Sequence, residues 1–566
     1  MNAEQLLQHF ERISEAPDAI PRLRRFILDL AVRGKLVEQN PTDTPVSQLL
    51  NEIAERKARA VDQRSVRASK KSVEQVEAWC AIPDSWHFVR LDKVANVVMG
   101  SSPPGSTYNK IGEGVPLING PVEFTPGSFG RTLINQYTTA PTAYCNEGDF
   151  LICVRGSTTG RTNVAAFRAC VGRGVAAIQP LFEDQFIRLA IRVRQEAILQ
   201  MGRGIAFPSI SRDQLAGLPI PLPPLAEQHR IVTKVDELMS LCDQLEAAKA
   251  EREQCRDSLV AASLQGLNQP AEEEETFREH ARFTFNNLPR ITTRTSHIKQ
   301  LRQTILNLAV RGKLVEQDPG DEPAAELLKR IAAEKARLVK AGKARKLEVD
   351  PVTNEEISFP VPSNWVWTRL GSIGDWGSGS TPSRGNSDLY GGGITWLKSG
   401  ELNDNRALEG SKETVSKLAV EKGSFRINKT GDVLIAMYGA TIGKVAILAE
   451  SAVTNQAICG CTPFPGVFNQ YLYFYLLSQR AQFHSASEGG AQPNISKIKI
   501  IWTTFPLPPL AEQHRIVAKV DELMAICDQL EAQITATEQD SRRFLESVLA
   551  DALAPGIELR EVAEVA

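Results

Sequence analysis

A segment of 27 residues occurs twice in this chain. It reads PLPPLAEQHRIVTKVDELMSLCDQLEA at 221–247 and PLPPLAEQHRIVAKVDELMAICDQLEA at 506–532, and only three positions differ. A second pair lies upstream, because AVRGKLVEQ at 31–39 returns unchanged at 309–317. Similarity at a long, fixed spacing indicates a repeated structural unit. We call these four repeated segments the frame, and any fold for the chain has to accommodate two nearly identical copies of it.

Between the frame segments lie two stretches that resemble each other little, and we call them the inserts. Both contain short β-type runs, such as FLICV at 150–154 and VLIAM at 433–437, followed by a helical stretch. This mixture predicts an α+β protein with two globular α/β inserts in a pseudo-two-fold internal repeat. The predicted regions are a helical region 1–85, insert 86–220, a long helix 221–265, an acidic linker 266–298, a helical region 299–364, insert 365–505 and a long helix 506–566.

The two predicted long helices carry apolar residues at alternating steps of four and three. This heptad spacing gives each helix one apolar seam, which a lone helix cannot bury. We predict that the two seams pack against each other in an antiparallel coiled coil of about 50 Å. The alternative is that each seam packs on its own domain. The seam residues are Ile231, Val235, Leu238, Cys242 and Leu245 in the first helix, and Ile516, Val520, Leu523, Cys527, Leu530 and Ile534 in the second.

Composition favours a soluble globular protein. No apolar run approaches the ~18 residues of a membrane span, and the polar N-terminus is unlike a secretory signal, so we expect a cytoplasmic protein. The nine cysteines include no CxxC pair, which favours reduced thiols over disulfides or zinc. The net charge of −2 argues mildly against a nucleic-acid binder. The inserts themselves are positive, with 13 Lys and Arg against 9 Asp and Glu in 86–220, and 13 against 10 in 365–505.

A glycine-rich loop after a predicted strand is the main candidate for ligand contact in each insert. GDFLICVRGSTTGR at 148–161 aligns with GDVLIAMYGATIGK at 431–444. Glycine lets backbone amides approach an anion, and the loop adds hydroxyls and a cation that can bind phosphate or base edges. The alternative is a purely structural turn. The candidate DNA contacts are Arg155, Ser157, Thr158, Thr159 and Arg161 in the first loop, and Tyr438, Thr441 and Lys444 in the second.

Two further pairs of aligned segments flank this loop. GSSP at 100–103 aligns with GSTP at 379–382, and an Ala-x-Pro-x-Ile-Ser pattern lies near the end of each insert. Hydroxyl, amide and cationic side chains in such loops suit hydrogen bonding to nucleic acid. The second group of candidates is Ser101, Ser102, Ser380, Thr381, Lys398, Arg203 and Asn494.

No signature of catalysis accompanies these loops. GATIGK has the wrong glycine spacing for a nucleotide-binding P-loop, and Val445 stands where that motif needs Ser or Thr. GxSxG, HExxH and EF-hand patterns are absent from the sequence. His229 and His514 occupy matching frame positions, which favours packing or capping over catalysis. We expect no active site, cofactor or metal in this chain.

Three sets of motifs together carry a family resemblance. They are the twin PLPPLAEQHRIV segments, the twin LAVRGKLVEQ segments, and the segments WHFVRL and WVWTRL that open the inserts at Trp86 and Trp365. In these motifs and their order the whole chain resembles the specificity subunit of type I restriction-modification enzymes. The resemblance implies two target recognition domains, each reading one half of an asymmetric bipartite DNA site, with the long helices as spacer.

The resemblance also implies partners and cofactors. It implies that the chain binds double-stranded DNA, two methyltransferase subunits and up to two restriction subunits. S-adenosylmethionine, Mg²⁺ and ATP would then reside in those partners. From the residues alone, two other functions stay open: a phosphate-handling enzyme that uses the glycine-rich loops, and a scaffold whose inserts bind proteins.

Overall fold

The chain forms two compact units, each containing one insert and its frame segments. Unit 1 comprises residues 1–251 and 538–566, and unit 2 comprises residues 252–537. Helix α9 (Leu225–Asn268) begins in unit 1 and ends in unit 2, whereas α18 (Leu510–Leu553) begins in unit 2 and ends in unit 1. The computed structural model describes residues 16–553 except 63–75, 127–129, 183–184, 203–208, 269–273, 424 and 488–492. Within these ranges, no helix is long and apolar enough to cross a membrane.

In unit 1 the first and last strands of the insert pair with each other. β1 (His87–Arg90) runs antiparallel to β11 (Pro219–Leu222), and we call this pair the clasp. Between these strands lie sheets of order β2-β10-β7-β8 and β3-β5-β4-β9-β6. The strands are β2 (Ala95–Met99), β3 (Tyr108–Asn109), β4 (Val115–Ile118), β5 (Tyr137–Thr138), β6 (Tyr144–Cys145), β7 (Phe150–Cys153), β8 (Thr162–Val164), β9 (Ala169–Val171) and β10 (Val175–Pro180). The helices are α3 (Ala19–Val32), α4 (Val46–Asp62), α5 (Leu91–Val94), α6 (Gln185–Val193), α7 (Gln195–Met201) and α8 (Arg212–Ala216).

Unit 2 repeats this plan with a different outer part. Its clasp is β12 (Val366–Arg369) with β21 (Thr504–Leu507), and its sheets have the orders β13-β20-β17-β18-β15 and β16-β14-β19. The strands are β13 (Gly374–Ser378), β14 (Tyr390–Leu397), β15 (Asn405–Leu408), β16 (Thr414–Val415), β17 (Val433–Ala436), β18 (Val445–Leu448), β19 (Val453–Thr454) and β20 (Ile458–Pro463). The helices are α10 (Glu274–Ile291), α11 (Thr295–Val310), α12 (Ala324–Lys340), α13 (Leu370–Ile373), α14 (Lys417–Lys422), α15 (Asn469–Ser478), α16 (Arg480–Ser485) and α17 (Lys497–Trp502). The predicted α+β class with two α/β inserts is confirmed.

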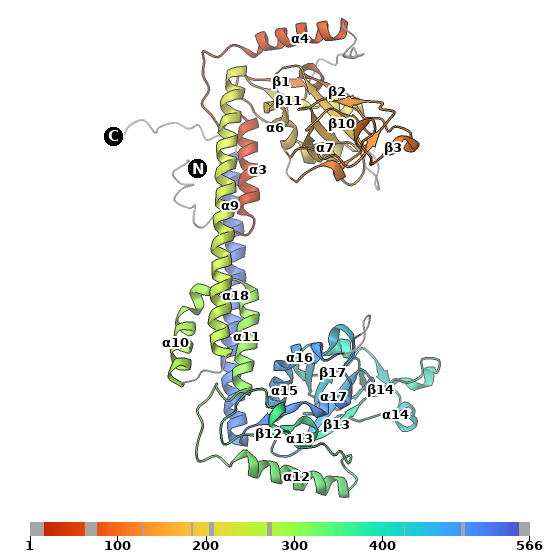
Figure 1. Cartoon of the computed structure of the whole chain (residues 1–566), viewed down its shortest axis with the longest axis vertical. Coiled ribbons are helices and arrows are strands. Elements are labelled where there is room, and N and C mark those ends of the chain that lie inside the picture. The colour runs from red at the N-terminus through yellow and green to blue at the C-terminus, as the bar shows by residue number, and fades with distance from the viewer. Residues whose placement is uncertain are drawn as a thin grey trace, which may run out of the picture. The chain divides into compact units, whose positions relative to one another are not determined.

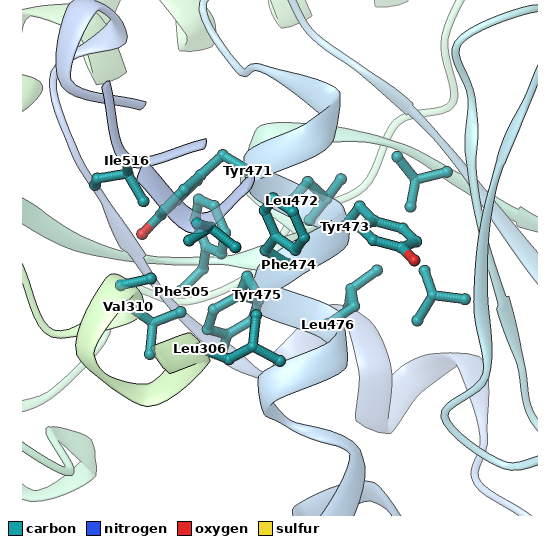
Figure 2. Close-up of a cluster of buried hydrophobic side chains, with 14 of the residues drawn as sticks. Leu306, Val310, Tyr471, Leu472, Tyr473, Phe474, Tyr475, Leu476, Phe505 and Ile516 are labelled. Atoms are coloured by element: carbon teal, nitrogen blue, oxygen red, sulfur yellow. The ribbon is translucent and has the colours of Figure 1, made fainter. Parts of the chain in front are cut away.

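The central sheets and the helices behind them are built from apolar runs. All residues of β7 and β17 are buried, as expected for strands covered on both faces. Helix α15 has the sequence NQYLYFYLLS and is buried nearly all round, so it lies inside the core of unit 2. Figure 2 shows its Tyr471 near Phe505 and Ile516, and its Tyr475 near Leu306. The Tyr471 hydroxyl donates to the Pro506 carbonyl at 3.1 Å, which satisfies a polar group that burial would otherwise leave unpaired.

The heptad seams also pack on shorter helices of their own units, the alternative named in the sequence analysis. In unit 1, Ile231 and Val235 of α9 share a core with α3. Arg24 of α3 also pairs with Asp243 and Glu246 of α9 at 2.5 and 2.7 Å. In unit 2, α11 lies beside α18 (Figure 1), and residues of α11 share a core with Ile516 and Val520 of the α18 seam. The physical reason is that α3 and α11 are apolar amphipathic helices repeated with the frame, so each seam has a partner close by in its own unit.

The antiparallel relation of the long helices is confirmed, and both are longer than predicted. Val260 and Leu264, near the end of α9, share the unit 2 core with Ile516 and Val520, near the start of α18. Each helix has 44 residues, or about 66 Å at 1.5 Å per residue. The heptad spacing of the seam covers only the first half of each helix, so it underestimated their length.

The predicted acidic linker is largely structured. Helix α9 continues to Asn268, and α10 begins at Glu274. Leu288 and Ile291 of α10 are buried in the unit 2 core, and Phe277 packs against it. Phe277, Ala281, Thr284, Leu288 and Ile291 follow steps of four and three, a helical period that the acidic run AEEEE hid from a composition-based assignment.

Candidate nucleic-acid interface

The glycine-rich loop after β7 is a tight turn that packs on the start of α7. Gly156 and Gly160 have φ values of 80° and 86°, which residues with a side chain rarely adopt. The Gly160 amide donates to the Cys153 carbonyl at 2.8 Å, which closes the turn. A Cβ on Gly160 would lie 3.1 Å from the Gln195 carbonyl oxygen. The backbone is therefore fixed by the fold, and the side chains of the loop are left to vary.

Most side chains of this first loop face solvent. Arg155, Ser157 and Arg161 are exposed, and Thr158 is half-buried. Thr159 differs, because it is buried and its hydroxyl donates to a carbonyl of the same turn at 2.7 Å. We therefore assign Thr159 to the turn itself, the structural alternative named in the sequence analysis, and keep the other four as candidates.

Arg155 faces a cavity of about 730 Å³ in the first insert. The backbone of Arg155 pairs with Ser209 in an antiparallel bridge, which brings the end of the insert against the loop. The Ser102 hydroxyl accepts a hydrogen bond from the Arg173 amide at 3.3 Å, which ties the GSSP loop to the same place. Cations, hydroxyls and an amide thus converge on one hollow. The lining residues are Ser102, Tyr108, Asn119, Arg155, Gly156, Arg173, Gly174 and Ser209.

The second insert builds the same turn with different side chains. Gly439 and Gly443 have φ values of 63° and 74°, and the Gly443 amide donates to the Ala436 carbonyl at 3.0 Å. Tyr438 takes the place of Arg155, is 43% exposed, and pairs with Asn494 in an antiparallel bridge. An aromatic ring and an amide side chain therefore stand where the first insert has a guanidinium and a hydroxyl.

The remaining candidates of the second insert differ in their freedom to bind a ligand. The Lys444 ammonium donates to the Asn403 side chain at 2.9 Å, so its charge is not neutralised by this contact. The Thr441 hydroxyl donates to the Tyr438 carbonyl within the turn at 2.8 Å. Lys398 forms an ion pair with Glu413, so a ligand would have to compete for its charge. Thr381 is exposed and hydrogen-bonded to Gln456.

For the three remaining candidate DNA contacts, the structure describes no side-chain interaction that bears on ligand binding. Ser101 is exposed beside Ser102, and its amide donates to the Val171 carbonyl at 2.9 Å. Ser380 is half-buried, and its carbonyl accepts from the Trp396 indole at 3.1 Å. Arg203 lies outside the described residues.

The cavity contains residues that the sequence analysis missed. Tyr108 donates to the Pro103 carbonyl at 3.2 Å, and Tyr390 of the second insert donates to the Pro382 carbonyl at 2.8 Å. Both prolines end the aligned GSSP and GSTP segments, but the tyrosines follow them at five and eight residues, and this difference hid the match. Asn119 likewise lies just after β4, as Lys398 lies just after β14. Arg173 and Ser209 had no sequence signal that we identified.

The side chains that could ligate a metal are scattered in the part of the chain that the structure describes. No cluster of three or more His, Cys, Asp or Glu side chains there is placed to hold a metal ion. Cys459 and Cys461 on β20 are buried, and burial raises the pKa of the Cys459 thiol to about 12. At neutral pH this thiol is protonated, which is the form that does not bind metals or act as a nucleophile.

Each matched segment of a known protein family contains one of these loops. The type I restriction modification DNA specificity domain matches this chain twice, over residues 83–252 and 362–537, which together make up more than half of it. The chain belongs to this family. Each match begins just before a clasp and ends within a long helix, so the matched unit is an insert together with the start of its helix. Family membership supports recognition of DNA sequence, and it supports neither the phosphate-handling enzyme nor the protein-binding scaffold.

Individual relatives extend the similarity to the whole chain. The specificity subunit of the type I restriction enzyme EcoAI from Escherichia coli is 32% identical, with 94% of this chain and 93% of that protein covered. The EcoEI specificity subunit from the same organism is 29% identical over the same shares of both chains. Among solved structures, the HsdS subunit from Thermoanaerobacter tengcongensis aligns with a TM-score of 0.43 at 18% identity, covering 85% of this chain and 100% of that one.

Proposed function

We propose that each insert is a target recognition domain that reads one half of a bipartite DNA site, and that the chain itself performs no chemistry. The observation that carries the proposal is the pair of loops after β7 and β17. Their backbones follow the same turn, while the side chains at equivalent positions differ, as with Arg155 and Tyr438. Sequence is read by side chains at base edges, so a shared backbone with different side chains favours two different half-sites.

The frame, by contrast, suits two copies of one partner. Leu241 of α9 and Ile526 of α18 occupy equivalent frame positions, and they are 51% and 41% exposed. Exposed apolar side chains on a repeated surface are typical of protein contacts. We propose that methyltransferase subunits dock on the frame, one per copy, that up to two restriction subunits join them, and that these partners hold S-adenosylmethionine, Mg²⁺ and ATP. On this proposal the chain acts in the cytoplasm, where the DNA lies.

An exchange of inserts tests the reading function. Residues 87–220 are replaced by the corresponding insert of a family member with a known target, and the methylated sequences are mapped in cells that also make the partner subunits. We expect one half of the methylated site to change to the donor's half-site, while the other half and the spacing stay the same. A matched exchange of 366–505 should change only the other half.

The control is a second hybrid in which the donor insert carries alanine at the residue equivalent to Arg155. It should assemble normally and methylate its new site more weakly. If either exchange left both halves of the methylated site as they were, the inserts would not be the reading domains.

A further inference from the structure

A basic segment that belongs to the second helical region, and not to the insert, lies against the second insert. After α12 ends at Lys340, Ala344 and Leu347 pack against the unit 2 core. Between them, the Arg345 amide donates to the Asp375 carboxylate of β13 at 3.4 Å, and the Arg345 side chain is exposed. The packing of its neighbours therefore holds Arg345 at the surface of this sheet.

Arg345 lies next to the loops already proposed to contact DNA. Its Nη1 is 3.6 Å from the position that a Cβ on Gly377 would take, and β13 ends one residue later, just before the GSTP loop. Lys497 begins α17 three residues after Asn494. The charges of both Arg345 and Lys497 act on Cys459, which pairs with Ser378 at the end of β13. Both cations thus lie near this end of the sheet.

The two cations carry charge that the surrounding protein does not neutralise. Among the described residues, no carboxylate forms an ion pair with Arg345 or Lys497. The nearby carboxylates are already engaged, since Asp375 pairs with Arg426 at 2.6 Å and Glu348 pairs with Lys346 at 2.9 Å. Two cations without carboxylate partners, next to a loop proposed to contact DNA, are suited to bind a backbone phosphate.

The repeat supplies an independent observation. The offset of 278 residues that relates the first frame pair places Arg67 at the position of Arg345, and the offset of 285 residues places Arg212 at the position of Lys497. Both of these positions are basic in both copies. Arg67 lies outside the described residues, while the Arg212 Nε donates to the Val97 carbonyl of β2 at 3.2 Å, at the matching sheet edge. A charge kept while the reading side chains change suits a contact common to all targets.

We propose that Arg345 and Lys497 bind the DNA phosphate backbone beside the loops of the second insert and add affinity that is independent of sequence. This inference rests on the proposed function of the insert in DNA recognition. Phosphate contacts position a protein on the duplex, whereas base contacts specify the sequence. Arg345 lies outside the insert, so its phosphate contact would stay in place when the insert, and with it the target, is exchanged.

The test is a salt titration of DNA binding by the full chain in complex with its methyltransferase subunits. The variants are Arg345→Ala, Lys497→Ala and the double variant, and the probes are a duplex with the mapped target site and one with both half-sites scrambled. We expect weaker binding to both duplexes by the same factor, and a slope of log K against log salt that falls by about 1 for each cation removed. The ratio of the two affinities should stay within about two-fold of that of the unmodified complex. Arg345→Lys should restore the slope.

Matched control variants distinguish a phosphate contact by Arg345 and Lys497 from the reading of DNA sequence by the insert. Lys346→Ala removes a neighbouring cation that is paired with Glu348, and it should leave the slope unchanged. Asn494→Ala should instead lower the ratio of target to scrambled affinity. Unchanged affinity and slope in the double variant, or a loss confined to the target duplex, would overturn the phosphate contact and leave the reading function standing. If the unmodified complex itself did not distinguish the two duplexes, the proposed function would fail first.

Discussion

A buried glutamate at the start of each long helix joins the frame to its insert. Glu227 is 1% exposed and accepts hydrogen bonds from the Trp86 indole at 3.0 Å and from Gln39 at 2.6 Å. The second copy repeats the arrangement, since Gln317 donates to Glu512 at 2.8 Å. Burial raises the pKa of both carboxyl groups, and the hydrogen bonds lower it only in part. Burying the ionised form of these two carboxyl groups therefore costs free energy at the point where each insert meets the frame.

This arrangement predicts a specific pH dependence of stability. A carboxyl group with a raised pKa in the folded state keeps its proton where the unfolded chain has lost it, so its contribution falls as pH rises above about 4.3. A Glu227→Gln, Glu512→Gln variant lacks this contribution. The free energy of unfolding of the variant relative to the unmodified chain should therefore increase from pH 4 towards pH 7 and then level off, as measured by urea denaturation.

The control for this experiment is Glu522→Gln, which removes an exposed carboxylate paired with Lys519. Its difference from the unmodified chain should be small at every pH. A difference for the double variant that stayed flat or decreased over the same range would show that the two glutamates are not destabilised by burial.

At the scale of elements, strands and helices with a strong apolar pattern could be predicted from the sequence, whereas the packing partners of the helices could not. The strands at 150–154 and 433–437 and the helices that follow the inserts' sheets were expected from short apolar runs and helical periods. The heptad seams predicted the antiparallel long helices but not α3 and α11, which pack on the same seams, because a heptad shows that a seam must be covered and does not say by how many helices. At the site, Arg155 and Tyr438 were found because they lie in aligned loops. Tyr108 was missed because its distance from Pro103 is not kept in the other copy.

Each copy of the frame contains one glycine at a position where the fold has no room for a larger residue. Gly34 and Gly312 end α3 and α11 with φ values of 67° and 66°. A Cβ on either would overlap the ring of Pro83 or Pro362, which lie just before the clasps. A positive φ costs a residue with a side chain roughly 1–2 kcal/mol. Because the overlap with proline adds to this cost, we expect Gly34→Ala to lower the free energy of unfolding by more than that amount. Urea denaturation followed by tryptophan fluorescence measures this.

Gly342 offers a matched control for that substitution. It follows α12 with a φ of 68°, and no atom lies within 4 Å of the position of an added Cβ. Gly342→Ala should therefore show the cost of the backbone strain without the overlap. Equal losses for Gly34→Ala and Gly342→Ala would mean that the contact with Pro83 does not matter to stability.

At the scale of the whole molecule, unit 1 is completed by the last part of α18. Leu545 and Val548 are buried with Ala16 and Ala19 in a separate small core, and Arg22 pairs with Glu546 at 3.0 Å. Residues more than 500 positions apart thus depend on each other, while unit 2 is continuous in sequence. The repeat predicted two units, but nothing in its spacing indicated that the two long helices are divided between them.

A substitution near the C-terminus should therefore loosen the N-terminal helix. Leu545→Ala removes a fully buried side chain, and we expect a loss of about 2–5 kcal/mol in the local stability of this core. Hydrogen exchange should become faster in residues 19–32 of α3 and stay unchanged in the sheets of unit 2. Ile526→Ala, on an exposed position of the same helix, is the control and should leave α3 protected. Unchanged exchange in α3 on Leu545→Ala would rule out this dependence.

The clasp has a consequence for how such a chain changes over generations. Because β1 pairs with β11 residue by residue, the insert leaves the frame and returns to it at neighbouring points. The segment between these two strands can therefore change in length and shape while the two ends stay paired, and the second insert is six residues longer than the first. The nearly identical stretches that follow each clasp are also places where genetic exchange can join one copy to another in frame. New combinations of half-sites can then arise by exchange of whole inserts, without a compensating substitution in the frame.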